Sequence, residues 1–422
     1  MKVPGFRTAK RLFPVFFAVL IFVFLSGQVY AGDTADFFYK YNPGDRYRVV
    51  STVSEDVYVD HILSYKAEIV NRISMEITAV NGSGGRYKAV FQTAEKTAPV
   101  GETSNAAAGG NDAAGTFQWS RDYESEFGQD RLGYMTIGDD YYMPMVQDVP
   151  VFPDRELHPG DTWNAAGKEV HDFRDSYGIE APYRIPFTAD YTYLGEKTWK
   201  GKSYPAFSVS YRISQECDPV PGRTFPLRIL GASDQTIYWD TEHGQAASYE
   251  EYFRTIVYLS NGQIWEYRGR AEAETVDAPP MNKEQMAKDI AGEISGIDDA
   301  SVRVSNEGVV ISLENIQFAP ESAILLGSEK AKLDKIAEVL MKYPDRDILV
   351  GGHTALAGTA EGRQQLSLAR ASAVADYLIG KNVRSPGRVV IRGYGAEQPV
   401  ADNGSEEGMR KNRRVEITIL EN

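Results

Sequence analysis

A two-residue alternation of apolar and polar side chains sets the first constraint on how residues 32–275 can fold. Successive side chains of an extended strand point to opposite faces, so such a segment buries one face and leaves the other in water. The segment 66–79 follows this rule, with one face made of Ala67, Ile69, Ile73, Met75 and Ile77 and the other of Lys66, Glu68, Arg72 and Glu76.

Tight turns join strands of this kind. Asn81-Gly82 and Asn261-Gly262 are hairpin signals, because both central residues of the favoured turn need a positive φ. The second joins residues 255–259 to 263–267, and His243-Gly244 is expected to turn another pair. Long antiparallel strands linked in this way predict a sandwich or an open, curved sheet for the β-rich region.

Two similar turns suggest an internal repeat in this region. Pro43-Gly44-Asp45 and Pro159-Gly160-Asp161 are each followed about 43 residues later by a tyrosine, Tyr87 or Tyr204. The predicted copies are residues 32–150 and 151–275, with the Gly- and Ala-rich residues 101–116 as a loop between them. Two unrelated turns are the alternative, because only a few positions match.

Residues 282–422 show a different pattern, in which short apolar strands alternate with helices. Strands are predicted at 302–304, 309–313, 347–351, 388–392 and 414–419. Strands alternating with helices indicate an α/β sandwich, one sheet with helices against one face. The whole chain is thus expected to be α+β, mainly antiparallel β in its N-terminal region and an α/β sandwich at its C-terminus.

Three helices are predicted in this second region. Asn282 and Gln285 form a capping box for the first, after a Pro-rich linker at residues 276–281. The residues predicted to share the buried side of each helix are Met286, Ile290 and Ile294 in the first, Leu333, Ile336, Ala337 and Leu340 in the second, which begins after Ser328, and Leu366, Ala369, Ala373 and Tyr377 in the third.

The N-terminus has the parts of a secretory signal peptide. Four basic residues precede the apolar run 12–25, and Val29 and Ala31 supply the small residues of a cleavage site before Gly32. Residues 1–31 are therefore predicted to be removed, which places the protein in the periplasm, in association with the outer membrane or free. An uncleaved anchor is the alternative, although the run is shorter than the roughly 20 residues of a spanning helix.

Charge and cysteine content narrow the partners. Residues 1–31 hold four basic and no acidic residues, so their removal moves the formal charge from −14 to −14 − 4 = −18. An acidic chain is a poor partner for nucleic acid or anionic lipid. Cys217 is the single cysteine and cannot form an internal disulfide, and no metal-ligand spacing or cofactor motif is present.

Five motifs lie in order between residues 352 and 417. They are Gly352-His353-Thr354, Leu366 to Arg370, Gly393-Tyr394-Gly395, Pro399 to Asn403, and Asn412 to Ile417. In this order and spacing the segment resembles the C-terminal domain of the OmpA family. The resemblance implies a module that holds peptidoglycan non-covalently, with Thr354, Arg363, Arg370, Asn412 and Arg413 as the candidate ligand-binding residues.

One residue departs from the family pattern. The resemblance implies an Asp after Gly-His-Thr that binds the ammonium of the stem's diamino acid, while Arg370 binds its carboxylate; Ala355 stands in the place of that Asp. Loss of one partner of a buried charged pair commonly costs about 2–5 kcal/mol. Either the site is inactive, or it reads a different stem, or another acid such as Glu361 takes over. Arg363, where many members carry Asn, is a second departure.

Other interpretations of these residues stay open. Arg370 and Arg413 could tie helix and strand ends together, and His353 is expected to hydrogen-bond within its loop rather than bind a metal. The predicted function is a non-enzymatic envelope protein, with peptidoglycan as the partner and envelope proteins as further partners of the β-rich region. The alternatives are a C-terminal domain that has become a structural or protein-binding module, and an outer-membrane β-barrel, which alternating strands and 25 tyrosines would permit.

Overall fold

The computed structural model describes residues 34–82, 84–99, 118–119, 122–218, 222–277, 281–314, 316 and 325–421. They fall into two compact units, a β unit that ends at Asp277 and a C-terminal unit that follows it, with Gln118 and Trp119 grouped with the second. The predicted signal peptide and the predicted loop 101–116 lie outside the described residues.

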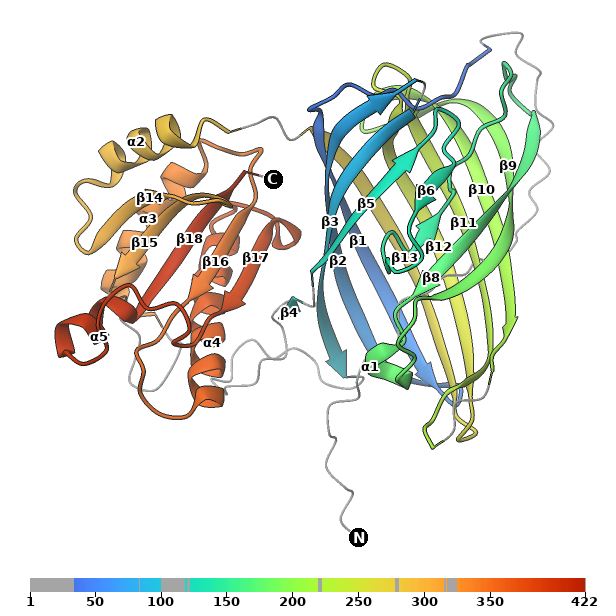
Figure 1. The fold of residues 1–422 in the computed structure, drawn as a ribbon. Helices are drawn as coiled ribbons and strands as arrows, with labels where there is room; N and C mark the ends of the chain where they lie inside the picture. The colour runs from blue at the N-terminus through green and yellow to red at the C-terminus, as the bar shows by residue number, and fades with distance from the viewer. Residues whose placement is uncertain are drawn as a thin grey trace. The chain divides into compact units, whose positions relative to one another are not determined.

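The β unit is one antiparallel sheet that curls into a nearly closed barrel (Figure 1). Along the sheet the strands run β6-β5-β3-β2-β1-β13-β12-β11-β10-β9-β8-β7, so the first long strand pairs with the last. Their bounds are β1 (Arg46–Val59), β2 (Ile62–Asn81), β3 (Gly84–Pro99), β4 (Gln118–Trp119), β5 (Tyr123–Gln129), β6 (Met135–Ile137), β7 (Val146–Gln147), β8 (Thr162–His171), β9 (Tyr183–Trp199), β10 (Lys202–Glu216), β11 (Pro226–Asp240), β12 (Gln245–Leu259) and β13 (Ile264–Asp277).

The predicted turns join neighbouring strands. Gly82 (φ 60°) lies between β2 and β3, Gly244 (φ 64°) between β11 and β12, and Gly262 (φ 88°) between β12 and β13. These φ values are in the region that glycine adopts without steric cost. A single short helix, α1 (Arg174–Tyr177), links β8 to β9.

The alternation along β2 places its faces largely as predicted. Ala67, Ile69 and Ile77 are buried, and Lys66 and Glu68 are exposed. The exception is Arg72, which was expected on the water-facing side but is only 3% exposed.

Aromatic side chains fill one end of the β unit. Phe37 and Phe152, from segments outside the strands, stack with ring centroids 5.3 Å apart. Phe152 also meets the rings of Phe207 at 5.2 Å and Trp239 at 4.8 Å. Edge-to-face and offset contacts of this kind add to the free energy gained by burying the rings.

The two Pro-Gly-Asp turns make matching backbone contacts. The Gly44 N–H donates to Ile77 O (2.7 Å), and the Ile77 N–H donates to Asp45 O (2.9 Å). In the second turn, Gly160 N–H donates to Tyr193 O (2.8 Å) and Tyr193 N–H to Asp161 O (2.9 Å). The internal repeat stays a prediction, and these two pairs of hydrogen bonds support it.

The C-terminal unit is a five-stranded sheet with helices, in the order β14-β15-β18-β16-β17. Only β16 and β17 pair in parallel. The bounds are α2 (Lys283–Ile294), β14 (Ala300–Val304), β15 (Gly308–Glu314), α3 (Gly327–Leu340), β16 (Ile348–Gly352), α4 (Ala360–Gly380), the 3₁₀ turn η1 (Pro386–Arg388), β17 (Val389–Gly393), α5 (Glu406–Asn412) and β18 (Arg414–Leu420).

The predicted strands of this unit are confirmed, and so is the buried side of α3, where Leu333, Ile336, Ala337 and Leu340 are at most 3% exposed. The α2 helix begins as predicted, with the Gln285 N–H donating to Asn282 Oδ1 at 3.0 Å. No helix among the described residues is long and apolar enough to cross a bilayer.

The predicted buried side of α4 was wrong. Ala369 is exposed, and the buried residues are Ser367, Ala371, Ser372, Val374, Ala375 and Leu378. The buried stripe of Ser367, Ala371, Val374 and Leu378 lies one residue further along the helix than the predicted one, because it begins at a serine, which a hydrophobic pattern does not count as buried. Small residues permit close approach, and a Cβ at Gly352 of β16 would lie 2.0 Å from the Ser367 carbonyl oxygen and 3.3 Å from the Ala371 Cβ.

Candidate functional site

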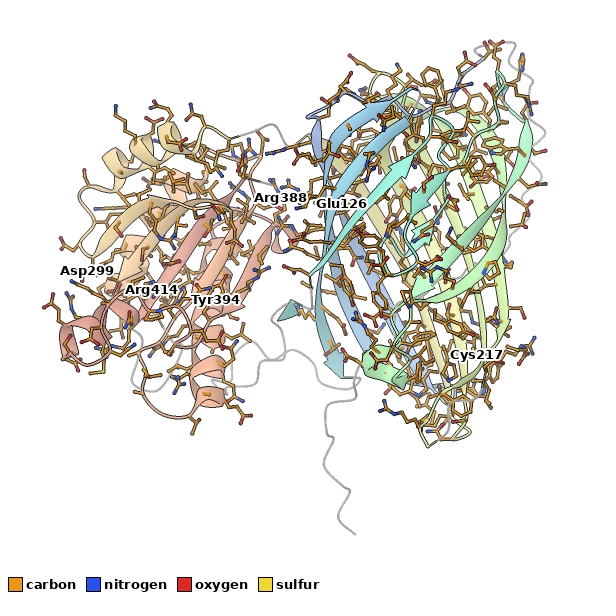
Figure 2. The ribbon with its side chains drawn as sticks, viewed as in Figure 1. Glu126, Cys217, Asp299, Arg388, Tyr394 and Arg414 are labelled. Carbon is orange, nitrogen blue, oxygen red and sulfur yellow. The ribbon has the colours of Figure 1, made fainter. Side chains whose placement is uncertain are left out.

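Three of the predicted motifs converge at the ends of β16 and β17. The His353 N–H donates to Arg414 O (2.9 Å), the Thr354 N–H donates to Gly395 O (2.7 Å), and the Tyr394 N–H donates to Gly352 O (2.9 Å). Parallel strands end at the same edge of a sheet, so the loops that follow β16 and β17 meet there. Tyr394 and Arg414 are marked in Figure 2.

The α4 helix attaches to these loops through Ser367. Its hydroxyl donates to Gln364 O (2.8 Å) and accepts from the Gly395 N–H (2.9 Å), and the Gln364 side-chain amide donates to Gly393 O (2.7 Å). Gly393 has no room for a side chain, because a Cβ would lie 2.7 Å from the Leu368 nitrogen. The glycines of the Gly-Tyr-Gly motif therefore let the loop lie directly on the helix.

Arg363 and Arg370 lie on the same side of α4 as this contact. Residues three and four apart are neighbours on a helix, so Arg363, Ser367 and Arg370 share one face. The Arg363 Nη1 donates to Gly358 O at 2.6 Å, across the loop that follows β16. Burial lowers the pKa of Arg370, and the nearby Arg413 lowers it further. The site thus gathers positive charge.

The Arg413 guanidinium has a carboxylate partner. Its Nη2 lies 2.8 Å from Glu406 Oε1, and both side chains are well exposed. Exposed pairs of this kind are worth about 0–1 kcal/mol. The contact with Glu406 supports the interpretation that Arg413 has a structural role. Because the charge of Arg413 lowers the pKa of Arg370, the Arg413 guanidinium also lies near that candidate ligand residue.

Ala355 is buried at 4% exposure, and its neighbour Thr354 is 7% exposed with no hydrogen-bond partner for Oγ1 among the described residues. Glu361, the acid suggested as a substitute, is exposed in the first turn of α4. Leu356 follows Ala355 and is 59% exposed, and its N–H donates to Asn403 Oδ1 (3.0 Å).

The Asn412 side chain holds the loop of the Pro399–Asn403 motif. Its Oδ1 accepts from the N–H groups of Val400 (2.8 Å) and Ala401 (3.0 Å). Its Nδ2 donates to Ala401 O and Asn403 Oδ1, both at 2.9 Å. The residue is 0% exposed, and each amide hydrogen and each oxygen lone pair has a partner within the protein.

His353 hydrogen-bonds through its backbone N–H, to Arg414 O, rather than through its ring. The ring stacks on Tyr394 at 4.9 Å, and its Nε2 lies 3.7 Å from Glu416 Oε2, an ion-pair distance that is longer than a hydrogen bond. Burial lowers the pKa of His353, so the ring is neutral at pH 7.

Glu416 is a buried, ionised residue beside Arg414 and His353. Its two oxygens accept from Arg414 Nε and Arg303 Nη2, each at 2.8 Å. Burial opposes ionisation, but the contacts with His353 and Arg414 outweigh it and lower the pKa of Glu416 to about 2. The Asn-Arg-Arg-Val-Glu motif thus supplies a buried ion pair as well as Arg413.

The structural roles of Ser367, Asn403 and Glu416 were not predicted from the sequence, although all three residues lie within the motifs. For Ser367 the available signal was its place at the centre of the Leu-Ser-x-x-Arg motif, on the helix that packs against the glycines of two other motifs.

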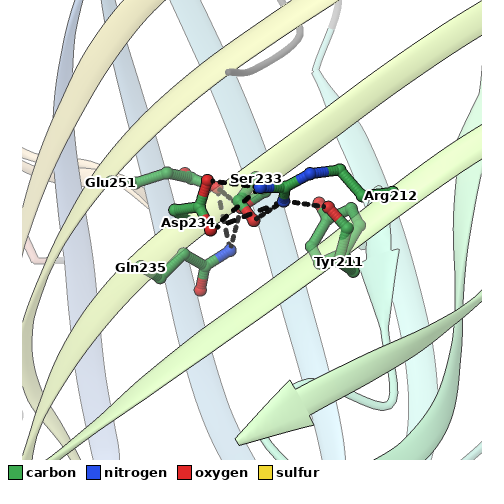
Figure 3. Close-up of polar contacts among 6 residues, drawn as sticks. All are labelled: Tyr211, Arg212, Ser233, Asp234, Gln235 and Glu251. Carbon is green, nitrogen blue, oxygen red and sulfur yellow. Dashed lines mark hydrogen bonds and ion pairs between the residues drawn. The ribbon is translucent and has the colours of Figure 1, made fainter. Parts of the chain in front are cut away.

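In the β unit, the burial of Glu169 and Glu251 was not predicted either; these residues are 1% and 4% exposed. Glu251 Oε1 accepts from the Ser233 hydroxyl (2.6 Å) and from the Gln235 side-chain amide (2.8 Å), as Figure 3 shows. Burial, with the charge of nearby Glu169 adding to it, raises the pKa of Glu251 to about 8 in spite of these hydrogen bonds.

A sequence model of the OmpA family matches residues 317–413. Outer membrane porin F of Pseudomonas aeruginosa is 36% identical over 105 residues, which cover 25% of this chain and 30% of that protein. Peptidoglycan-binding protein ArfA of Mycobacterium tuberculosis is 35% identical over 104 residues, covering 25% and 32%. The chain therefore spans about a third of the length of these curated relatives.

Among solved structures, the cell wall anchor of the type VI secretion system from Pseudomonas aeruginosa is 30% identical, covering 33% of this chain and 99% of that one, with a TM-score of 0.29. The matched residues include the first four motifs, the loops after β16 and β17, and Asn412 and Arg413 of the fifth motif, whereas β18 lies outside the match. The C-terminal part of this chain is an OmpA-family domain.

Proposed function

We propose that the C-terminal unit associates non-covalently with peptidoglycan by binding a carboxylate of its peptide stem. The observation that carries the proposal is the placement of Arg370, half-buried on α4 beside the loops after β16 and β17, with Arg413 near enough to lower its pKa. A guanidinium is suited to planar, two-pronged recognition of a carboxylate. A bound anion would also relieve the repulsion between the two arginines.

The comparisons support this assignment. One relative is named a peptidoglycan-binding protein, and one solved structure is described as a cell wall anchor. Thr354 and Arg363 are proposed to flank the ligand, and Asn412 is proposed to position the 399–403 loop, because its amide is fully used within the protein.

The methyl group of Ala355 cannot replace a carboxylate. The proposal is therefore that Arg370 retains the carboxylate half of the recognition while the ammonium half is absent. The alternative is a domain that has lost peptidoglycan binding and serves as a structural or protein-binding module, and it too is based on Ala355. Exposed Glu361 gives little support to a substitute acid, since an exposed charge is screened by water.

We infer that the β unit faces water in the cell envelope. Its outward-facing side chains form ion pairs midway along the strands, including Arg270 with Glu250 (2.9 Å) and Arg212 with Asp234 (3.0 Å). A charged residue on the lipid face of a spanning strand costs about 2–4 kcal/mol at the bilayer midplane. This outer face favours a water-facing envelope protein over the outer-membrane alternative.

Co-sedimentation of the purified protein with isolated sacculi tests the proposal. The unmodified protein should pellet, and Arg370→Ala should lose at least about tenfold in affinity, because a charge-assisted contact is removed. Arg370→Lys should recover only part of it, since Lys cannot make the two-pronged contact. Lys335→Ala, at an exposed position of α3, is the matched control for loss of one positive charge.

The same assay separates the alternative. If the unmodified protein stays in solution while Ala355→Asp pellets, the domain has kept the fold of the site and lost the ligand. Equal pelleting of Arg370→Ala and Lys335→Ala would contradict the role given to Arg370.

A further inference from the structure

The loop that follows β16 lies against the start of α4 through Gly395. The Thr354 N–H donates to Gly395 O (2.7 Å), and a Cβ at Gly395 would lie 3.8 Å from the Arg363 carbonyl carbon. The Arg363 side chain contacts the same loop, because its Nη1 donates to Gly358 O at 2.6 Å. Arg363 therefore lies beside the stretch of chain that begins at Thr354 and Ala355.

Positive charge gathers at this end of the C-terminal unit. Arg363 and Arg370 are seven residues apart and share one face of α4. Burial, and then the charge of Arg413, lower the pKa of Arg370, so a third guanidinium is near. The N-terminus of α4 adds partial positive charge at the same place. An anionic or neutral group is favoured here over a cation.

The acids of this region do not offset that charge. Those of the surrounding loops and of the first turns of α4 and α5 are exposed to water, which screens them: Glu361, Glu397, Asp402, Glu406 and Glu407. The buried acid Glu416 already accepts from two arginines, Arg414 and Arg303. An ammonium group placed beside Arg363 would therefore meet like charge, with no buried carboxylate left to stabilise it.

Two buried polar atoms in the same place have no partner. Thr354 is 7% exposed, and its Oγ1 makes no hydrogen bond to any described residue. The Arg363 Nε is likewise buried and unpartnered within the described part of the chain. Such atoms destabilise a fold unless a bound group satisfies them. The Arg363 N–H needs an acceptor, which an ammonium group lacks and an amide carbonyl provides.

The surface next to these atoms is apolar. Ala355 contributes only a methyl group, and Leu356, which follows it, is 59% exposed. Val400 is 55% exposed and lies on a loop that is joined to Leu356 through the side chains of Asn403 and Asn412. A charged group beside these side chains would lose hydration without gaining a partner, whereas a hydrocarbon chain is stabilised by burial there.

From these observations we propose that the C-terminal unit recognises stems in which the side-chain amino group of the diamino acid is acylated, as it is in a cross-link between two stems. Arg370 binds the carboxylate beside that amide, Arg363 Nε donates to the amide carbonyl, and Thr354 Oγ1 accepts from the amide N–H. Arg363 thus determines specificity. The inference rests on the proposed binding of peptidoglycan and names the form of the stem that is bound.

Chemical treatment of sacculi whose stems contain diaminopimelate tests the proposal. Acetylation converts their free amino groups to amides, and reductive methylation of a second portion keeps these groups cationic. Co-sedimentation of the full chain at pH 7 should show binding to acetylated sacculi at least about tenfold tighter than to untreated or methylated ones. Because acetylation also changes the overall charge of the sacculus, the ratio of the two affinities is compared between variants.

Three variants make the test specific. Arg363→Asn removes both the like charge and the donor, and should reduce the preference for acetylated sacculi severalfold. Ala355→Asp introduces a carboxylate and should turn the preference toward untreated sacculi. Lys335→Asn, at an exposed position of α3, is the matched control for loss of one positive charge and should leave the ratio unchanged. Arg363 is partly exposed, so its variant keeps the test independent of how the buried Ala355→Asp change is tolerated.

The outcomes separate this inference from the proposed function. The same ratio for the unmodified chain and for Arg363→Asn would overturn the inference. Equal or weaker binding after acetylation, with Arg370→Ala still losing its pelleting, would also overturn it and leave the proposed function standing. A chain that pellets with none of the three preparations would overturn both.

Discussion

The stability of the β unit should fall as the pH rises, because of Glu251. The pKa of this carboxyl is about 8 in the folded chain, against 4.5 for an unperturbed glutamate. Below pH 4.5 it is protonated in both the folded and the unfolded states. Between these two values only the unfolded state loses the proton, so stability is fully present below pH 4.5 and is lost as the pH rises through 8.

The size of the effect follows from the shift. A difference of 8 − 4.5 = 3.5 pKa units at about 1.4 kcal/mol per unit sets an upper limit of about 5 kcal/mol. Glu251→Gln removes the titration and keeps an oxygen that accepts from Ser233 and Gln235. The free energy of unfolding of the variant minus that of the unmodified protein should therefore rise by up to about 1.4 kcal/mol for each pH unit between 4.5 and 8. Above pH 8 this difference should stay constant.

Urea unfolding of both proteins from pH 4 to 9, followed by tryptophan fluorescence, measures this difference. Four of the five tryptophans, Trp163, Trp199, Trp239 and Trp265, lie in strands of the β unit, so most of the signal reports that unit, and Trp119 is common to both proteins. Other titrating groups are common to both proteins and cancel in the difference. Parallel stability curves for the two proteins over this range would refute the reasoning.

Two further predictions concern the C-terminal unit, and calorimetry measures both. Gly352→Ala should destabilise it by about 1–3 kcal/mol or more, because a Cβ would lie 2.0 Å from the Ser367 carbonyl oxygen. Its control, Gly292→Ala in α2, meets nothing within 4 Å and should stabilise by about 0.5–1 kcal/mol; a loss in both variants would contradict the steric explanation. Glu416→Gln should lower the free energy of unfolding by up to about 3 kcal/mol at pH 7, because the pKa of Glu416 is about 2 in the folded chain against 4.5 for an unperturbed glutamate. The contribution of the ionised carboxylate is present above pH 4.5 and is lost as the pH falls through 2. A penalty that persists undiminished at pH 2 would show that the loss is not electrostatic.

Much of the local structure could be predicted from the sequence. The alternation in β2, the Asn-Gly turns and the capped start of α2 are encoded in short stretches of chain, where backbone geometry and side-chain period act directly. The five motifs likewise identified the domain that carries Arg370. The errors came where burial depended on a distant partner, as with Arg72 and with the packing side of α4.

The same division applies to the candidate site. Arg370 and the departure at Ala355 are visible in the sequence, because residue identity alone defines them. Two features follow only from the arrangement of segments far apart in the chain: the Asn412 side chain makes all its hydrogen bonds to the 400–403 loop, and the His353 ring stacks on Tyr394.

The sequence by itself determined the period of each strand, the turns between strands, the order of helices and strands in the C-terminal unit, and the family of that unit. Only the tertiary structure decided that β1 pairs with β13, which joins the strands into one sheet, and that this sheet curls into a nearly closed barrel with odd-numbered residues of its central strands facing inward. Period two says that a strand has two faces, but pairing between residues more than 200 positions apart decides which face is enclosed. Glu251 is an ordinary glutamate in the sequence, and it becomes a buried acid beside Glu169 only once the sheet has curled.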